Sequence, residues 1–372
     1  MFLIRSLDWY GGAQRQLVNL ASGLSKVGHD VTVVTYYSHV PLERELAEAG
    51  VEVRSLGKRS RWDLFQPIVR FLCLVRKLQP TVIHGYLSTA NILAVMAKAC
   101  CPSLKVAWGL RASNMHWDEY DWLHKMSFVC ERALSRFADL LIVNSYAGRD
   151  HYASSGFPID KMIVIHNGID TARFRPDKEA GSAMKRRWGI DKKDRIVCLV
   201  GRLDPMKDHI TFLRAAALLA QRRSGLRFVC VGQGASGYEN ALRAQAEREG
   251  VADRIMWVGC FYDMKPVYNA CDVVVSSSVW GEGFPNVLAE AIACGVPCVA
   301  TDVGDSSLLC APMVGTLVPP GDPASMAKAI ESVLDADPAY QPATMHEQIV
   351  RSFGREQLVR TTEGHLARLA CL

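Results

Sequence analysis

The chain of 372 residues lacks any apolar run of the roughly 20 residues that a membrane-spanning helix needs. It also lacks a leader pattern at its start, where the strand-like run Phe2–Ser6 begins at once. These absences argue against a membrane-spanning protein and against a secreted one. We therefore expect a cytoplasmic protein whose contact with a membrane is peripheral, on the inner face of the cell membrane.

Paired cysteines are also missing, because the twelve cysteines form no C-x-x-C motif. Several of them stand inside apolar runs, where cysteine acts as a small hydrophobic residue, so we expect reduced thiols and neither disulfides nor a zinc site. The net charge of +5 is small, and no zinc-finger or basic-helix pattern is present. The sequence therefore predicts no nucleic-acid partner.

Short apolar, β-branched runs alternate with helical patterns throughout, which is typical of α/β folds with parallel sheets. In the first half these strand-like runs lie near Phe2–Ser6, Val31–Thr35, Val51–Ser55, Thr81–His84, Lys105–Trp108, Leu140–Val143 and Met162–Ile165. The pattern then restarts, with runs near Ile196–Val200, Arg227–Val231, Ile255–Val258, Val273–Ser276 and Pro297–Ala300.

The turn-rich segment HNGIDTARFRPD, residues 166–177, separates the two halves. The sequence thus predicts two Rossmann-like domains, 1–172 and 173–350, and a C-terminal helix, 351–372, that packs back on the N-terminal domain. Ligands of such sheets bind at the carboxyl ends of the strands, so we expect the site in a cleft across which the domains face each other.

The stretch EGFPNVLAE, residues 282–290, places two carboxylates eight positions apart at a loop-to-helix junction. Pro285 suits the first helical turn, which puts Glu282 in the preceding loop and Glu290 about two turns along the helix. The N-terminal end of such a helix binds anions. Here the backbone of Phe284, Pro285, Asn286 and Val287 forms this N-terminal end. The arrangement suits a sugar, a diphosphate and a ribose in a row; the alternative is an ordinary amphipathic helix with solvated acids.

In each half, a glycine-containing loop follows the first strand. Gly11 and Gly12 open the first helix, where the missing Cβ atoms let the backbone approach a phosphate, although many α/β loops carry such glycines for the turn alone. In the second half, GRLDPMKD begins with Gly201 and carries Arg202 and Lys207. These two cations can neutralise a leaving diphosphate without a metal; solvated surface charge is the alternative.

Two further motifs match a cofactor or metal motif by their letters but are not interpreted as such sites. VGQGASG holds a literal G-x-G-x-x-G at Gly232, Gly234 and Gly237, but it follows the second strand of its domain, whereas the dinucleotide fingerprint belongs to the first. The D-x-D at Asp335 sits at a helix end before a proline and is taken as a solvated turn. We therefore expect no nicotinamide or flavin cofactor and no metal, although the VGQGASG loop can still lie near the nucleotide.

The chain resembles the retaining GT-B glycosyltransferases of family 4, also called glycosyl transferases group 1. Four features in this order along the family pattern carry the resemblance: the Gly11-Gly12 turn, the HNGID linker, GRLDPMKD and Glu282-x7-Glu290. The similarity extends over nearly the whole chain, since GGAQRQLVNLASGL resembles the first helix of that family and TDVGDSSLL and GTLVPPGDP resemble its last βα units. The resemblance implies a metal-independent enzyme that binds a nucleotide sugar mostly with its second domain and retains the anomeric configuration.

The resemblance also implies roles for single residues. Glu282 would bind hydroxyls of the donor sugar and stabilise the positively charged transition state, and Glu290 would hydrogen-bond the ribose. Arg202 and Lys207 would bind the diphosphate, aided by Gly12 and by the backbone of residues 284–287. No nucleophile stands out in the sequence, which fits a front-face reaction in which the leaving phosphate takes the acceptor proton.

The chain departs from the family where many members carry a histidine at the end of the strand KVAWGL, because Arg111 and Asn114 follow here. Arg111 either contacts an acceptor phosphate or carboxylate or is a structural residue between the domains. His84, at the end of its own strand, either lines the cleft or is a satisfied buried histidine.

Segment 58–80 is basic and aromatic, with a single acid, Asp63. An amphipathic helix of this kind can lie on an anionic membrane, which would favour a lipid-linked acceptor and a role in surface polysaccharide or lipopolysaccharide synthesis. The alternative is a core-facing helix with basic solvent residues. The competing functions are a GT-B nucleotide-sugar epimerase or hydrolase and a non-catalytic nucleotide-sugar-binding scaffold.

Overall fold

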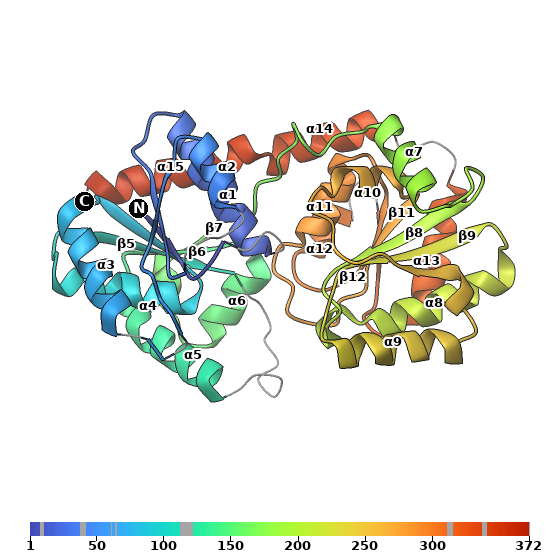
Figure 1. The fold of residues 1–372 in the computed structure, drawn as a ribbon, viewed down its shortest axis with the longest axis horizontal. Coiled ribbons are helices and arrows are strands. Elements are labelled where there is room, and N and C mark those ends of the chain that lie inside the picture. The colour runs from blue at the N-terminus through green and yellow to red at the C-terminus, as the bar shows by residue number, and fades with distance from the viewer. Residues whose placement is uncertain are drawn as a thin grey trace. The chain divides into compact units, whose positions relative to one another are not determined.

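The structure is a computed structural model that describes residues 1–7, 11–37, 42–60, 62–63, 65–111, 122–310, 315–336 and 341–371. The chain forms two compact units. The first unit contains residues 1–168 and 355–372, and the second contains residues 169–354. Each unit is a parallel sheet with helices on both faces (Figure 1).

The first unit has a seven-stranded sheet in the order β3-β2-β1-β4-β5-β6-β7. Its strands are β1 (Phe2–Ile4), β2 (Thr32–Thr35), β3 (Glu52–Ser55), β4 (Val82–Tyr86), β5 (Lys105–Leu110), β6 (Leu140–Val143) and β7 (Met162–Val164). All neighbouring strands pair in parallel, which confirms the α/β prediction for this half.

Helices cover both faces of this first sheet (Figure 1). One face carries α1 (Gly12–Lys26), α2 (Glu43–Glu48) and α15 (Arg355–Cys371). The other carries α3 (Phe65–Leu78), α4 (Ser88–Met96), α5 (Trp122–Leu134) and α6 (Tyr146–Ser154). Leu358 and Val359 of α15 share a core cluster with Leu17 and Leu20 of α1. The C-terminal helix therefore packs on the N-terminal unit, as the sequence predicts.

The second unit has a six-stranded sheet in the order β10-β9-β8-β11-β12-β13. Its strands are β8 (Arg195–Val200), β9 (Leu226–Val231), β10 (Ile255–Trp257), β11 (Val273–Ser276), β12 (Cys298–Thr301) and β13 (Gly315–Val318). The strand-like runs of the sequence did not include β13, an edge strand that is only partly buried, and only the resemblance of GTLVPPGDP to a last βα unit indicated it. The strand order reverses between β8 and β11, and such a reversal opens a crevice at the carboxyl ends of the strands.

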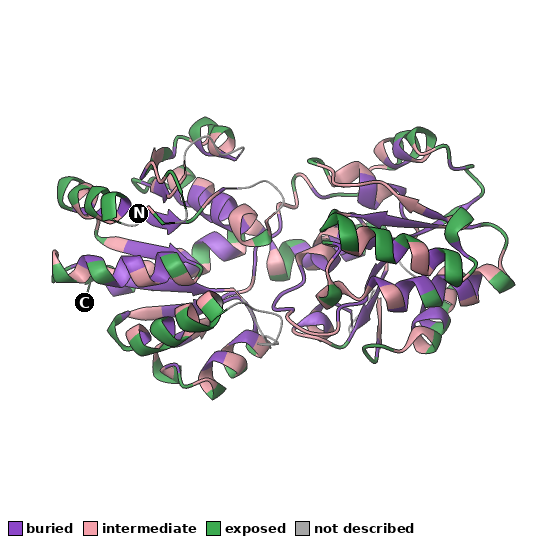
Figure 2. Ribbon diagram, turned by 60° about the horizontal axis from the view of Figure 1, so that its bottom comes forward, coloured by how far each residue is buried: buried purple, intermediate pink, exposed green. Residues whose placement is uncertain are grey.

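Eight helices of the second unit are described: α7 (Lys178–Arg187), α8 (His209–Arg222), α9 (Ser236–Arg248), α10 (Lys265–Ala270), α11 (Asn286–Ala293), α12 (Ser306–Cys310), α13 (Pro323–Asp335) and α14 (Pro342–Phe353). One core cluster lies between the sheet and α7, α10, α11 and α14, and another lies between the sheet and α8, α9 and α13. Figure 2 shows the strands buried and the outer faces of the helices exposed.

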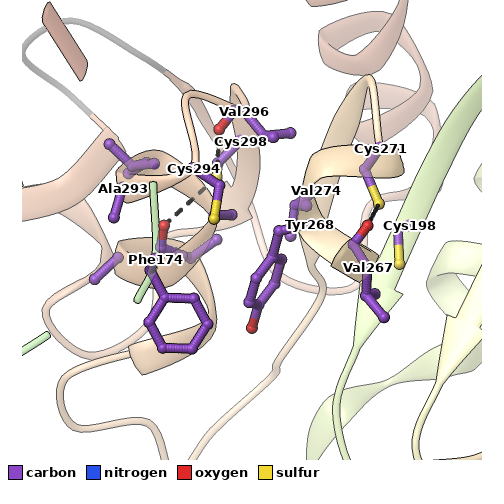
Figure 3. Close-up of a cluster of buried hydrophobic side chains, with 14 of the residues drawn as sticks. Phe174, Cys198, Val267, Tyr268, Cys271, Val274, Ala293, Cys294, Val296 and Cys298 are labelled. Atoms are coloured by element: carbon purple, nitrogen blue, oxygen red, sulfur yellow. Dashed lines mark hydrogen bonds between the residues drawn. The ribbon is translucent and has the colours of Figure 1, made fainter. Parts of the chain in front are cut away.

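Cysteine contributes to the first of these clusters as a small apolar residue. Cys198, Cys271, Cys294 and Cys298 lie among aliphatic and aromatic side chains (Figure 3). All twelve cysteines fall within the described part of the chain, and none is in a disulfide. No helix among the described residues is both long and apolar enough to cross a membrane.

Candidate active site

The loop after β8 is built by two capping aspartates. Asp204 accepts a hydrogen bond from Met206 N at 3.0 Å, and Asp208, in the left-handed region with φ of 41°, accepts one from Thr211 N at 3.1 Å and so caps α8. These turns direct Lys207 back along the loop. An added Cβ at Gly201 would lie 3.3 Å from Lys207 Cδ, so the lysine stem runs beside Gly201.

The loop after β11 lies against this first loop. Val279 N donates to Met206 O at 2.9 Å, and Ser277 Oγ donates to Lys207 O at 2.7 Å. Across this contact Lys207 Nζ donates to Glu282 Oε1. The same carboxylate oxygen accepts from Ser278 Oγ at 2.6 Å. Lys207 and Glu282, distant in sequence, thus form one ion pair at the carboxyl ends of neighbouring strands.

Glu282 is held as a carboxylate. Its side chain is buried, and burial alone would raise its pKa, but the ammonium of Lys207 and the hydrogen bond from Ser278 have the opposite effect. The more distant charge of Arg202 adds to them, and the pKa of Glu282 lies below its ordinary value of 4.5. The site therefore presents a buried, ionised carboxylate whose pairing cation stands beside it.

A third loop, after β12, fixes the backbone on which Glu282 stands. Gly304 has φ of +63°, and an added Cβ there would lie 2.4 Å from Glu282 O, closer than real atoms approach. Asp305 N donates to Gly283 O at 2.9 Å, and Thr301 Oγ1 donates to Ser278 O at 2.6 Å. Only glycine fits at position 304, since a side chain would displace the loop that carries the carboxylate.

The second carboxylate, Glu290, lies on α11 and faces a buried tyrosine. Tyr268 Oη donates to Glu290 Oε2 at 2.7 Å. Burial raises the pKa of Tyr268 well above its ordinary value, and the neighbouring Glu290 carboxylate raises it further, so the phenol stays protonated and acts as the donor. The helix begins at Asn286, and Pro285 is its extended N-cap rather than a residue of its first turn, which corrects the sequence interpretation.

Arg202 differs from Lys207 in its surroundings. Its side chain is 67% exposed, and it pairs with Asp204 Oδ2 at 3.2 Å within its own loop. An exposed pair of this kind contributes little to stability, so the guanidinium is available to a ligand at small cost. The loop therefore presents one exposed cation and one that is already paired with a buried carboxylate.

The G-x-G-x-x-G loop and the D-x-D turn both have local structural contacts. An added Cβ at Gly232 would lie 1.9 Å from Gly201 O, so this glycine permits the loop after β9 to pack against the loop after β8. Asp335 forms an ion pair with Arg223 at the end of α13. Among the described residues, no group of three or more His, Cys, Asp or Glu side chains is placed to hold a metal ion.

The remaining candidates lie in the first unit. Gly11 is the extended N-cap of α1, and Gly12 is its first residue. Arg111 follows β5, where its Nη1 donates to Asn167 Oδ1 at 2.8 Å and its Nη2 donates to Tyr86 Oη at 2.9 Å. The guanidinium carbon of Arg111 also stands 4.7 Å from the centre of the Tyr86 ring. Asn114 lies outside the described residues.

His84 is buried, as one of the two interpretations holds, but no hydrogen bond from the described residues satisfies its ring. Neither ring nitrogen has a hydrogen-bond partner among the described residues. Burial lowers its pKa well below the ordinary value, and the charge of Arg111 lowers it further, so the imidazole is neutral. Arg111 itself forms no ion pair within the described part of the chain. Its guanidinium donates hydrogen bonds to the neutral side chains of Asn167 and Tyr86.

Comparison with known proteins agrees with this arrangement. Residues 10–173 match the family described as Glycosyltransferase Family 4, and residues 194–336 match Glycosyl transferases group 1. The two matches occupy the two halves in the order that the fold requires. The chain belongs to the group 1, family 4 glycosyltransferases.

Individual relatives of this glycosyltransferase-family chain agree. It is 33% identical over 248 residues to a D-inositol 3-phosphate glycosyltransferase of Segniliparus rotundus, covering 64% of this chain and 54% of the relative. It is 31% identical over 210 residues to the lipopolysaccharide core biosynthesis mannosyltransferase LpsB of Rhizobium meliloti, covering 54% of this chain and 59% of the relative. The chain thus spans about half the length of these curated relatives.

The fold of this family member is matched by solved structures. Anabaena HepE in complex with UDP-glucose has a TM-score of 0.87 and 21% identity, covering 99% of this chain and 98% of that chain. WaaG, a glycosyltransferase involved in lipopolysaccharide biosynthesis, has a TM-score of 0.74 and 15% identity, covering 98% of each chain. These likenesses establish the GT-B fold, with two Rossmann-like units.

Sequence reasoning missed three supporting residues of this glycosyltransferase-family chain. Ser278 and Tyr268 hold the two carboxylates, but neither serine nor tyrosine stands out in an unaligned sequence. Gln16 Nε2 donates to Gly168 O at 3.0 Å and its Oε1 accepts from Gly168 N at 2.8 Å, so α1 fixes the end of the first unit. The polar Gln16 on the apolar face of a predicted helix was the available signal for that contact.

Proposed function

We propose that this chain is a retaining, metal-independent glycosyltransferase that moves a hexose-type sugar from a nucleotide-diphosphate donor to a lipid-linked saccharide acceptor. The observation that carries the proposal is the cluster of Lys207, Ser278 and Glu282 at the reversal of the second sheet. A buried ionised carboxylate beside a cation suits a reaction in which positive charge develops on a sugar while negative charge develops on a phosphate. The HepE complex with UDP-glucose supports a donor of this class.

The proposed roles follow from the surroundings of each residue. Glu282 faces the donor sugar and stabilises its cationic transition state, while Arg202 and Lys207 bind the diphosphate in place of a metal. Glu290, which Tyr268 orients, accepts a hydrogen bond from the ribose. The backbone from Phe284 to Val287, with Gly201, Gly11 and Gly12, completes the donor-binding set.

In the proposed reaction the bond between the anomeric carbon and the phosphate oxygen breaks, and the acceptor oxygen bonds to that carbon on the same face. The acceptor proton passes to the leaving phosphate, so atoms and charge balance without a nucleophile from the protein. Lys207 stabilises the negative charge that develops on the leaving phosphate, and Glu282 stabilises the positive charge that develops on the sugar. Because the acceptor attacks from the side that the phosphate leaves, the anomeric configuration is retained.

The acceptor is assigned to the first unit, to His84 and Arg111 and, as an expectation from the sequence, Asn114. Arg111 is a half-buried cation that neutral partners hold and that pairs with no acid among the described residues, which suits an anionic group on the acceptor. The relatives named for inositol 3-phosphate and for the lipopolysaccharide core support a phosphorylated or lipid-linked acceptor and a role in surface glycan synthesis. Peripheral contact with the anionic inner face of the cell membrane belongs to the same proposal.

A panel of nucleotide sugars tests the proposed function. The protein is incubated with each donor, with and without saccharide acceptors, and released nucleotide and sugar products are measured. Acceptor-dependent release supports the transferase, and nuclear magnetic resonance of the product reports retention or inversion. An epimerised or hydrolysed sugar without acceptor would indicate the epimerase or hydrolase instead, and donor binding without any turnover would indicate a scaffold.

A further inference from the structure

The first unit exposes large apolar side chains on α3 and α5, two helices on the same face of its sheet (Figure 1). Phe65 at the start of α3 is 80% exposed, Trp62 just before it is 75% exposed, and Trp122 at the start of α5 is 68% exposed. Apolar residues on a protein surface are ordinarily scattered singly. The α3/α5 surface consists of Trp62, Phe65, Val69 and Cys73 with Trp122, Met126, Val129 and Phe137.

The exposed residues form a stripe along each helix. Phe65, Val69 and Cys73 are spaced four apart, and residues at that spacing share one face of an α-helix. Phe71 and Val75 occupy the opposite face of α3 and are fully buried in the core. Phe65 does not belong to this packing face, since it is exposed. The core contact of α3 therefore does not account for its outer apolar stripe.

The same pattern recurs on α5. Trp122, Met126 and Val129 are spaced four and three apart, and each is exposed. The acid of this helix, Glu131, is 1% exposed and accepts a hydrogen bond from Asn91 Nδ2 at 2.7 Å, so its charge does not reach the surface. Both helices thus carry apolar residues on their outward faces as well as their inward faces.

The charges beside these stripes are basic. The charged residues of α3 are Arg70, Arg76 and Lys77, and all three are exposed. Arg70 is partly engaged, since its Nη1 donates to Leu56 O at 2.8 Å. The exposed charges within α5 are likewise basic, although Asp118, Glu119 and Asp121 precede this helix in the chain. We therefore expect α3 to contribute more of the electrostatic attraction than α5.

We propose that the α3/α5 surface docks on an anionic lipid bilayer. The aromatic and aliphatic stripes would enter the boundary between headgroups and acyl chains, while Arg76 and Lys77 would lie among the anionic headgroups. Charge complementarity favours a bilayer, because a basic surface with outward aromatic side chains and no exposed acid on α3 matches an anionic interface. The biological role of this docking rests on the proposed function, transfer to a lipid-linked acceptor. The test of docking needs neither a donor nor an acceptor.

Native thiols make the surface measurable. Cys73 on α3 and Cys130 on α5 are exposed, and Cys371 is exposed at the end of α15, on the opposite face of the same sheet. Variants that keep one of these three, with the other two and the half-buried Cys100, Cys101 and Cys260 changed to Ser, carry an environment-sensitive fluorophore at a single site. The vesicles contain phosphatidylglycerol and phosphatidylcholine in equal parts, with a nitroxide-bearing lipid as quencher.

We expect the labels at Cys73 and Cys130 to shift to the blue and to be quenched when vesicles are added, and the label at Cys371 to show neither change. The variant with Arg76→Gln and Lys77→Gln should bind these vesicles on the order of tenfold or more weakly, since each cation near an anionic surface contributes roughly fivefold. The variant with Phe65→Ser and Val69→Ser should also bind several-fold more weakly, with little change in salt dependence.

The matched control is Val27→Ser, because Val27 is 56% exposed at the end of α1, on the opposite face. It should bind vesicles as the parent does. Circular dichroism and the melting temperature verify that all variants fold, and binding of a nucleoside diphosphate should be unchanged in all of them. A chain that binds vesicles but turns over no nucleotide sugar would leave this inference standing and remove the proposed activity.

Two results would overturn the inference. In the first, parent and surface variants bind anionic vesicles equally, or the Cys371 label enters the bilayer as deeply as the other two. In the second, the parent ignores vesicles but self-associates in analytical ultracentrifugation, and the Phe65→Ser and Val69→Ser variant is monomeric. The α3/α5 surface would then be an interface between copies of this chain.

Discussion

Lys207 and Glu282 form an ion pair that joins the loop after β8 to the loop after β11. Their side chains are 18% and 11% exposed, and Ser278 donates a further hydrogen bond to the carboxylate. Withdrawing two charges from water is costly, and only good geometry with additional hydrogen bonds offsets that cost. The pair is therefore a poor candidate for a purely stabilising feature and a good candidate for a functional one.

Breaking this pair from one side should destabilise the protein. Lys207→Met leaves the Glu282 carboxylate buried without its cation, and we expect a loss of about 3 kcal/mol in the free energy of unfolding of the second unit, at the lower end for buried pairs. The variant that combines Lys207→Met with Glu282→Gln should lose less than the sum of the single changes. Urea denaturation of the four proteins measures the coupling; additive losses would contradict it.

The lowered pKa of Glu282 predicts how stability depends on pH. Because the carboxyl binds protons more weakly in the folded state than in the unfolded one, its contribution is fully present above its ordinary value of 4.5. It is lost as the pH falls through the folded-state pKa. Glu282→Gln removes this contribution, so stability measured by denaturation should fall less steeply below about pH 4.5 than in the parent. Parallel curves for the two proteins would contradict the assignment.

Substituting either cation of the proposed donor site should lower turnover, but only one of the two substitutions should also lower stability. Arg202→Ala and Lys207→Ala should each lower turnover by about tenfold to a thousandfold, the scale of lost electrostatic stabilisation. Only Lys207→Ala should also lower the melting temperature, since Arg202 is exposed and pairs only within its loop. EDTA should leave turnover unchanged. Turnover that EDTA abolishes and Mg²⁺ restores would refute metal independence.

The two carboxylates should differ in the kinetic constant that they affect. Glu282→Gln keeps the shape but removes the charge that faces the reacting sugar, so it should lower kcat more than donor affinity. Glu290→Gln acts far from the reacting carbon and should mainly weaken nucleotide binding. Calorimetry with a nucleoside diphosphate measures this effect, and unchanged affinity would remove the proposed ribose contact.

Tyr268→Phe provides a companion to Glu290→Gln. It removes the hydroxyl that donates to Glu290 at 2.7 Å and keeps the buried ring. If the tyrosine orients the carboxylate for the ribose, nucleotide affinity should fall by a smaller factor than in Glu290→Gln, with kcat nearly unchanged. Tyr268→Phe with affinity equal to that of the parent would show that Glu290 needs no such support.

Much of the fold could be predicted from the sequence because its signals are local. A short apolar run or a helical spacing depends on neighbours in the chain, and so the α/β class and the parallel strands of both units were predicted. The pattern of apolar runs missed β13, which only the family resemblance indicated, because Gly315–Val318 gains its strand character from pairing with β12. Helix ends were less certain for the same reason, as Pro285 shows.

The sequence by itself determined which residue types are at the candidate site: two carboxylates eight positions apart, two cations in one loop, and glycines beside them. Only the tertiary structure decided that Lys207 pairs with Glu282 while Arg202 stays exposed, and that Tyr268 holds Glu290. Only the structure turned Phe65 outward and left His84 buried without a partner among the described residues. The physical reason is that burial and pairing depend on which side chains the fold brings together. These side chains lie far apart in the sequence, and a local sequence pattern carries no information about them.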